Sequence, residues 1–435
     1  MSLLRRIKID SRRGERELER LVRRSRNVIN SRTLRQARRI VNDVRRRGDR
    51  ALLAAVGQHD GFEVGEVADL RMPLWRADSG GHDFGEAFSQ ALEKAISAVD
   101  RFHSPQVRPG YEHESEGVWV QERREPLRRV GIYVPGGRFP YPSTVVMTVI
   151  PARLAGVEEI VVVTPPHAYL GSSALRYTLN RLEVREIWGM GGAQAIAALA
   201  YGTESIGRVD KILGPGNAWV NAAKQLVQGD VAIDGVPGPT EVLIFAEGEV
   251  DEEWIAADLL AQAEHDPQAA ALLMTSDPDL AKRVSAALER QLESLSTRDT
   301  ALQSIKSYGR ALLVGGLEEG LELAERIAPE HLQLVGEGPE GLAPRVRNAG
   351  AVFVGASTPE VFGVYVAGPS HVLPTCGSAR YNSALGVDDF IRRSHCVRFS
   401  PEAAVEWSEV AAALADAEGL EAHAAAARQR SGAES

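Results

Sequence analysis

Apolar runs of strand length alternate with helical segments through the middle of the chain, beginning near residue 115. Most runs are short and end in glycine or proline, as is typical of strands buried on both faces of a parallel sheet. The segments between them are rich in small and aliphatic residues, which favours packed helices. The expected strands here are 118–122, 128–134, 158–166, 184–192 and 209–216, and the expected helices include 144–155 and 193–202.

The same alternation continues from residue 240 to about 356, and the last segment, from about 385, is alanine-rich and expected to be helical. Buried strands that alternate with helices predict an α/β fold whose parallel sheets are covered on both faces. The expected strands are 240–247, 269–276, 310–316 and 348–356, and the expected helices are 252–266, 279–295 and 316–336.

Several strands end in glycine, as in GIYVPGG, IWGMGG and ILGPGN. Ligands of open α/β sheets bind at the carboxyl ends of strands, and glycine there lets phosphate approach the backbone and the next helix N-terminus. No GxGxxG motif stands in this region. IWGMGGAQA is the nearest approach, and it is equally compatible with a tight turn between a strand and a helix.

The first 50 residues are strongly basic, with eighteen Lys or Arg against six Asp or Glu. Within them, 32–56 carries apolar residues near helical spacing. One interpretation is an arm for an acidic partner, and the other is an amphipathic helix with a solvated arginine face. We favour the second, because no aromatic residues interleave and the whole chain has a net charge of −9.

Composition narrows the class of protein further. A chain of 435 residues with 44% hydrophobic and 25% charged residues is typical of a globular protein with two or three domains. Its two cysteines argue against a disulfide scaffold and a cysteine-based zinc site. With no apolar leader and no run long enough to cross a bilayer, we expect a cytoplasmic protein that binds neither nucleic acid nor membrane.

Two pairs of polar residues are candidates for chemistry. Gln262 and His265 stand three apart in AQAEHDP, so on a helix they share one face and can address one metal ion, although most such pairs bind nothing. Glu330 and His331 in IAPEHLQLV place a carboxylate beside an imidazole, two groups suited to proton transfer. Pro329 predicts a helix start or a loop there. Neither pair alone identifies a reaction.

Taken in order, nine segments of the chain resemble the histidinol dehydrogenase family. The resemblance runs from about residue 30 to 425, and it is specific as a set although no single motif decides it. The segments are GIYVPGGRFPYPSTVVMTVIPARLAGVEEIVVVTPP, GMGGAQAIAALAYGT, KILGPGNAWVNAAKQLV, IDGVPGPTEVLIFA, LLAQAEHDP, APEHLQL, NAGAVFVGA, AGPSHVLPTCGSARYNSALGVDDF and AEGLEAH.

The resemblance implies a zinc-assisted oxidation of L-histidinol to L-histidine through an aldehyde, with two NAD⁺ reduced, as the last step of histidine biosynthesis. It implies two incomplete Rossmann-like three-layer α/β domains with parallel sheets and small helical segments at both ends. It also implies an intertwined homodimer in which the C-terminal tail completes the partner's site. The expected division is 1–30 as a helical arm, 31–132 with 240–384 as one domain, 133–239 as the NAD-binding domain, and 385–435 as the tail.

Carried over position by position, the resemblance also suggests a set of site residues. Glu330 and His331 match the water-activating acid and the general base. The positions that match NAD contacts are Tyr133, Gln194 and Asn217; those that match zinc ligands are Gln262, His265 and His423; and those that match contacts to histidinol are Thr240, which stands where the family usually has serine, Glu360, His371 and Glu418.

One position departs from the family pattern. Where the family usually reads Gly-Asp-Tyr and the aspartate is a fourth protein ligand to zinc, this chain has Gly363-Val364-Tyr365. Three protein ligands are enough for many catalytic zinc sites, but weaker binding is expected here. The alternatives are an active enzyme with weak zinc, an impaired enzyme, a relative that oxidises another alcohol such as a sulfopropanediol, and a catalytically dead binding protein.

Overall fold

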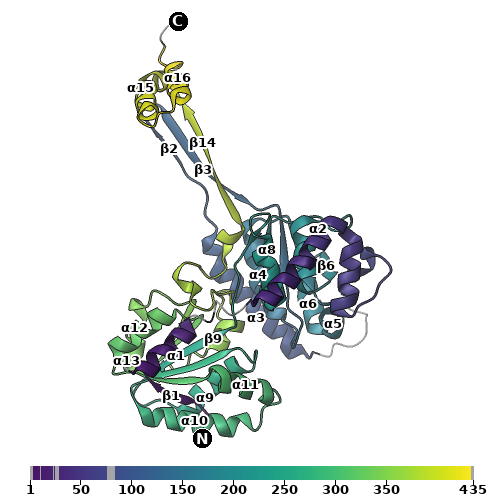
Figure 1. Cartoon of the computed structure of the whole chain (residues 1–435), viewed down its shortest axis with the longest axis vertical. Helices are drawn as coiled ribbons and strands as arrows, with labels where there is room; N and C mark the ends of the chain where they lie inside the picture. The colour runs from purple at the N-terminus through teal and green to yellow at the C-terminus, as the bar shows by residue number, and fades with distance from the viewer. Residues whose placement is uncertain (1–2, 10, 23, 25–28, 76–83, 433–435) are drawn as a thin grey trace.

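Two parallel sheets and an antiparallel arm make up the fold, which is seen here in a computed structural model (Figure 1). The structure describes residues 3–9, 11–22, 24, 29–75 and 84–432. In this described part, none of the helices combines the length and apolar character needed to cross a membrane. The expected α/β class is confirmed, with each parallel sheet between two layers of helices.

The larger sheet has six parallel strands in the order β1-β11-β10-β9-β12-β13. Its central strands are apolar and buried along their whole length, because helices cover both faces. One face carries α9 (Glu252–Ala263), α10 (Pro278–Leu292) and α11 (Arg298–Tyr308), and the other carries α1 (Arg12–Val22) and α12 (Leu317–Ile327). The strands are β1 (Arg5–Lys8), β9 (Glu241–Ala246), β10 (Ala270–Thr275), β11 (Arg310–Leu313), β12 (His331–Val335) and β13 (Ala351–Val354), and the short helices α13 (Glu337–Glu340) and α14 (Glu360–Tyr365) follow β12 and β13.

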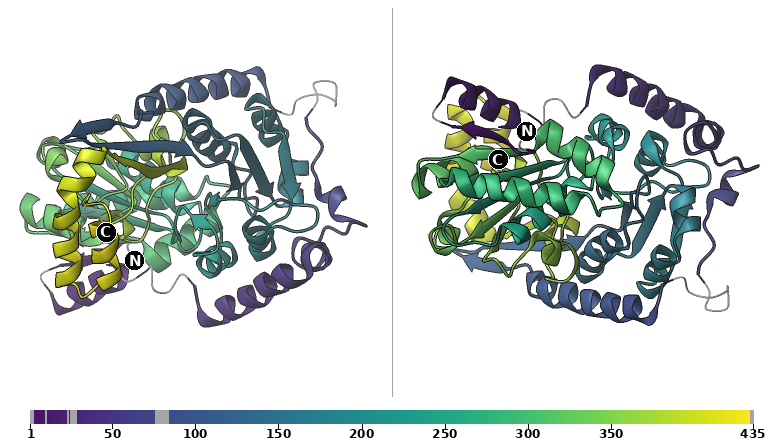
Figure 2. Two further views of the ribbon diagram at one scale, coloured as in Figure 1. Left: turned by 90° about the horizontal axis from the view of Figure 1, so that it is seen from above. Right: turned by 90° about the horizontal axis from the view of Figure 1, so that it is seen from below.

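The smaller sheet has five parallel strands in the order β6-β5-β4-β7-β8. Its two faces bear separate apolar layers, one built with α2, α7 and α8 and the other with α3, α4 and α6. Figure 2 shows α2 and α3 on opposite outer sides of this body. The elements are β4 (Arg129–Tyr133), β5 (Glu159–Thr164), β6 (Glu186–Gly189), β7 (Lys211–Leu213), β8 (Ala232–Ile233), α2 (Ser31–Asp60), α3 (Glu86–His103), α4 (Pro142–Ala155), α5 (Pro166–Gly171), α6 (Ser173–Arg181), α7 (Gly192–Tyr201) and α8 (Ala218–Val227).

A narrow arm projects away from both bodies (Figure 1). It is an antiparallel sheet in the order β14-β3-β2, with two helices at its tip. Its elements are β2 (Glu112–Ser115), β3 (Val118–Pro126), β14 (Ile391–Phe399), α15 (Pro401–Ala417) and α16 (Glu421–Arg428). The expectation of a purely helical tail from residue 385 is therefore wrong. Its strand β14 is largely solvent-exposed, so its sequence lacks the buried apolar run that marks the other strands.

The helix expected over 316–336 is also wrong in its second half. Helix α12 ends at Ile327, because Ala328 adopts the left-handed conformation (φ 49°) and Pro329 cannot continue a helix. After Glu330, the five residues His331–Val335 form β12, a fully buried strand between β9 and β13. The sheet thus decides the structure of HLQLV, and Glu330 lies at the entrance to a strand.

Packing also differs from the expected domain division. Residues of α2, among them Val41 and Leu52, pack with α7 and α8 on the smaller sheet, and Leu92 of α3 packs on its opposite face. The apolar faces of α2 and α3 are therefore buried on the smaller sheet and not on the sheet formed by 240–384. Conversely, the chain start is more than a helical arm, because β1 extends the larger sheet beside β11.

Candidate active site

A cavity of about 910 Å³ lies where the two parallel sheets meet. On the side of the smaller sheet it opens at the carboxyl ends of β4 and β7, where the strand order reverses, which is the usual ligand position in such sheets. On the side of the larger sheet it opens at the amino ends of β9 and β12, through Thr240 and Glu330. The glycine-ended strands predicted this position only for the smaller sheet.

Glu330 is a buried carboxyl group at the cavity wall. Its Oε2 lies 2.5 Å from the hydroxyl of Thr240 and accepts the backbone N–H of Glu241 at 3.1 Å. Burial raises the pKa of Glu330 to about 8, and the nearby Glu241 carboxylate raises it further, while the hydrogen bonds lower it. A carboxyl group with a pKa near neutrality can both give and take a proton in one reaction.

His331, next to it, is held in one tautomer. Its Nδ1 lies 3.1 Å from the backbone carbonyl of Glu241, and because a carbonyl can only accept, the proton sits on Nδ1. Its Nε2 is therefore the unprotonated nitrogen that can accept a proton. Glu360 lies 3.5 Å from Nδ1, and burial raises the pKa of this carboxyl group to about 7.

Gln262 is fully buried behind this wall and links the carboxyl groups. Its amide nitrogen faces Glu360 at 3.0 Å, and its oxygen accepts the hydroxyl of Thr240 at 2.9 Å, since the reverse orientation would place an oxygen against a carboxylate. Thr240 thus stands between Gln262 and Glu330, with its hydroxyl 2.5 Å from Glu330 Oε2. Like burial, Glu330 in turn raises the pKa of the neighbouring Glu360.

Two histidines line the cavity beside Val364. His371 donates from Nδ1 to the carbonyl of Val364 at 2.9 Å, and burial lowers the pKa of His371 to about 4, so its ring is neutral. Desolvation likewise lowers the pKa of His265. Neutral imidazoles suit a metal ion, but the apolar side chain of Val364 stands among them and offers no ligand.

The residues of one chain do not complete a zinc site. Across the described residues, no group of three His, Cys, Asp or Glu side chains is arranged to hold a metal ion. Gln262 is bonded to Thr240 and Glu360 and does not line the cavity, which leaves His265 as the expected ligand that does. His423 and the expected substrate contact Glu418 are exposed at the tip of the projecting arm (Figure 1).

The three residues expected to contact NAD lie together at the smaller sheet. Tyr133 ends β4 and accepts the N–H of Gly192 at 3.3 Å, and Asn217 caps α8 through Trp219 and Val220. All line the cavity with Gln194. Around them glycines at the strand ends leave room for a ligand: a Cβ on Gly137 or Gly235, both in the cavity wall, would meet no atom within 4 Å. This cradle fits a nucleotide cofactor.

Three further residues support the site without having been predicted. Asp60, at the end of α2, accepts from Gly191 and from Gln194, and burial raises its pKa. Lys224, fully buried, donates to the carbonyl of Gly214 and pairs with Asp234, which holds the loop after β7. Arg24 pairs with the buried Glu241 behind Glu330. Nothing local in the sequence marks them, because each acts on a segment distant in the chain.

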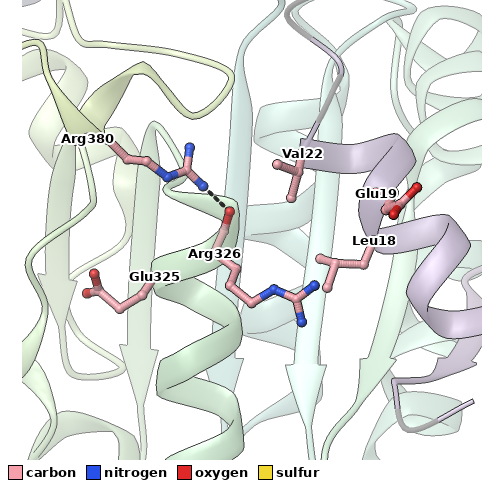
Figure 3. A pocket seen from close by; sticks show the side chains of 6 residues that line it. All are labelled: Leu18, Glu19, Val22, Glu325, Arg326 and Arg380. Atoms are coloured by element: carbon pink, nitrogen blue, oxygen red, sulfur yellow. Dashed lines mark hydrogen bonds between the residues drawn. The ribbon is translucent and has the colours of Figure 1, made fainter.

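A separate hollow of about 400 Å³ lies between α1 and α12 (Figure 3). Arg380 closes one side of it by donating to the backbone carbonyl of Arg326. It shares no lining residue with the larger cavity, so we assign it no part in the candidate site. Its lining is Leu18, Glu19, Val22, Glu325, Arg326 and Arg380.

Comparison with known proteins agrees with this geometry. The sequence profile of the family described as histidinol dehydrogenase matches residues 23–431. Histidinol dehydrogenase of Agrobacterium fabrum is 46% identical over 388 residues, 89% of this chain and 90% of its own, and that of Synechococcus sp. is 44% identical over 396 residues, 90% and 91%. The crystal structure of histidinol dehydrogenase from Elizabethkingia anophelis has a TM-score of 0.86 to this fold at 31% identity, over 99% of this chain and 98% of that one. Because the similarity extends over nearly the whole chain in both sequence and fold, the chain belongs to the histidinol dehydrogenase family.

Proposed function

We propose that the protein is a cytoplasmic, NAD-dependent dehydrogenase that oxidises L-histidinol to L-histidine through the aldehyde, the last step of histidine biosynthesis. The observation that carries the proposal is the buried Glu330–His331 pair, which faces the same cavity as the glycine-lined strand ends. The names of the relatives support the substrate. The complete reaction takes four electrons from one carbon and consumes two NAD⁺ and one water.

The proton chemistry falls to the Glu-His pair. His331 takes the proton of the alcohol at Nε2, since Nδ1 is occupied by the hydrogen bond to the carbonyl of Glu241. Glu330, when deprotonated, draws a proton from water as the water adds to the aldehyde carbon. Once His331 has released its first proton to solvent, it deprotonates the resulting hydrate. The same two groups serve both oxidations, which their position beside one another allows.

The smaller sheet supplies the cofactor site. Tyr133, Gln194 and Asn217 would hold NAD⁺ against the ends of β4, β6 and β7. NAD⁺, when bound, accepts the hydride in each oxidation. The chain would orient the alcohol between this cradle and His331, while Glu360 and His371 would contact the imidazole or amino group of histidinol.

Zinc has an incomplete set of ligands in this chain, so no step is derived through it. The expected ligands Gln262 and His265 come from one end of α9, and His423 lies on the arm. The valine at position 364 favours a second candidate function. The protein would then be a family relative that oxidises another alcohol, such as a sulfopropanediol, or an enzyme impaired by the missing carboxylate.

A second copy of the chain would complete the site. The arm carries Glu418 and His423 far from the cavity of its own chain (Figure 1), and its strand and helices expose apolar side chains. Exposed apolar residues also stand on α14 and just after it, near the cavity. We propose a homodimer in which each arm reaches the other subunit's cavity. The exposed residues are Val397, Phe399, Val410, Leu414 and Leu420 on the arm, and Phe362, Tyr365 and Val366 beside the cavity.

The test is the amount of NADH formed per L-histidinol consumed by zinc-supplemented protein. Two NADH per alcohol support the proposal. His331→Asn should abolish the first oxidation and leave NAD⁺ binding within about twofold, because the amide cannot take the proton. Oxidation at an undiminished rate by this variant would refute the base assignment, and a folded wild-type protein that binds NAD⁺ but leaves histidinol unchanged would favour the second candidate function.

A further inference from the structure

We propose that Asp60 selects NAD⁺ over NADP⁺ by accepting hydrogen bonds from the ribose hydroxyls of the cofactor's adenosine half. The inference rests on the proposed use of a nicotinamide cofactor and adds the residue that discriminates between the two. It is carried by the position of this carboxylate in the cavity wall and by the bonds that orient it.

One oxygen of Asp60 is fixed and the other is left for a ligand. Oδ2 accepts the backbone N–H of Gly191 at 3.0 Å and the side-chain amide of Gln194 at 2.9 Å. Among the residues that the structure describes, no hydrogen bond reaches Oδ1. A Cβ at position 191 would lie 2.6 Å from Oδ1, so only glycine permits this approach. The carboxylate is therefore held rigidly at the cavity wall with an acceptor unused.

Asp60 lies at the end of the cavity that is remote from the chemistry. The reacting groups stand by Thr240, which follows directly on the segment leaving β8, at one edge of the smaller sheet. Asp60 contacts the turn after β6, at the opposite edge. From β8 to β6 there are four strand spacings, about 19 Å. With the nicotinamide at His331, the adenosine half falls on the side of Asp60.

The chemistry of this corner suits a ribose diol and disfavours a phosphate. A carboxylate accepts from the hydroxyls of an adenosine ribose, as acidic residues do in other dinucleotide sites. A 2′-phosphate would instead bring a second negative group against it and would replace one of the two hydroxyls that can donate. His59 and His167 lie close enough to Asp60 to influence its carboxylate, and Arg138 lines the same cavity. The discrimination therefore rests on the carboxylate of Asp60 itself, which repels a 2′-phosphate.

The experiment measures the dissociation constants of NAD⁺ and NADP⁺ by quenching of tryptophan fluorescence, since Trp219 lines the cavity. The wild-type protein is expected to bind NAD⁺ at least about a hundredfold more tightly. The Asp60→Ser variant should bind NAD⁺ about tenfold to a hundredfold more weakly than wild type, because it loses a hydrogen bond to a charged group. The affinity of this variant for NADP⁺ should equal or exceed that of wild type, so its preference for NAD⁺ over NADP⁺ should fall to about tenfold or less.

Asp60→Asn is the second variant. Its side chain has the same shape as that of Asp60 and keeps an oxygen that can accept from Gly191, so the fold is preserved. This variant should bind NADP⁺ more tightly. Asp43→Asn is the matched control: Asp43 lies on the same helix, paired with Arg47 at the surface, and its loss should leave the preference unchanged. In the oxidation of histidinol, Asp60→Ser should raise the KM for NAD⁺ and change kcat by less than about twofold. A substitution that misplaced a catalytic group would lower kcat instead.

Three results would overturn the inference. An unchanged NAD⁺/NADP⁺ preference in folded Asp60 variants refutes it and leaves the proposed function intact. If the Asp60 variants bind NAD⁺ and NADP⁺ more weakly by the same factor, Asp60 only positions Gln194 and does not discriminate between the cofactors. Failure of the wild-type protein to bind either nucleotide refutes the proposed cofactor and the inference with it.

Discussion

Replacing Glu330 by glutamine should make the protein more stable at pH 8 but inactive in oxidising the aldehyde. The carboxyl group is buried, and its pKa rises from 4.5 to about 8. A pKa raised in the folded state means that the unfolded chain releases this proton first, so its contribution to stability is complete below pH 4.5 and is lost as the pH rises through 8. At about 1.36 kcal/mol per unit, wild-type protein loses about 5 kcal/mol over this window through Glu330 alone.

Glutamine is neutral and still accepts from the N–H of Glu241, so the variant should escape this loss. Because Glu330 also raises the pKa of Glu360, the gain measured will be smaller than about 5 kcal/mol. We expect the variant to be more stable than wild type at pH 8, by at least about 1 kcal/mol, equally stable at pH 4.5, and inactive in oxidising the aldehyde.

The assay is urea unfolding at a series of pH values from 4.5 to 8.5, combined with aldehyde-dependent NADH formation. Glu322→Gln, on the exposed face of α12, is the matched control and should leave the pH dependence of stability as in wild type. If Glu330→Gln and wild type lose stability in parallel as the pH rises, Glu330 is not a buried neutral acid. If the variant keeps full aldehyde oxidation, its role in activating water is refuted.

Two further predictions concern the metal and the support behind the site. Val364→Asp should raise zinc affinity at least about tenfold and raise turnover, because it adds a hard oxygen ligand beside His265; unchanged affinity by calorimetry would contradict this. Arg24→Met should lower the free energy of unfolding by about 3–5 kcal/mol, because it leaves the carboxylate of Glu241, 3% exposed, without its partner. Changing Glu241 to glutamine in the same protein should recover part of the loss, and a loss below about 1 kcal/mol in the single variant would refute the reasoning.

The sequence by itself determined the elements whose signal is local. Strands such as β9 and β10, buried along their whole length, follow from unbroken apolar runs, and α4 follows from its small and apolar residues. The glycines after β4 and β7 indicated the ligand edge of the smaller sheet by their position at strand ends. The family resemblance singled out residues that the fold gathers around one cavity, including Tyr133, Glu330 and His371.

Tertiary structure alone decided what depends on partners distant in the chain. The five residues HLQLV are compatible with either a helix or a strand, and two neighbouring strands select the strand. An amphipathic helix such as α2 shows which face it buries but not against what, which is why the sequence did not predict its place on the smaller sheet. The pairing of β14 with β3 carries Glu418 and His423 away from the cavity of their own chain. Periodicity records the burial of a face, whereas the surface that covers it is fixed by packing of the whole chain.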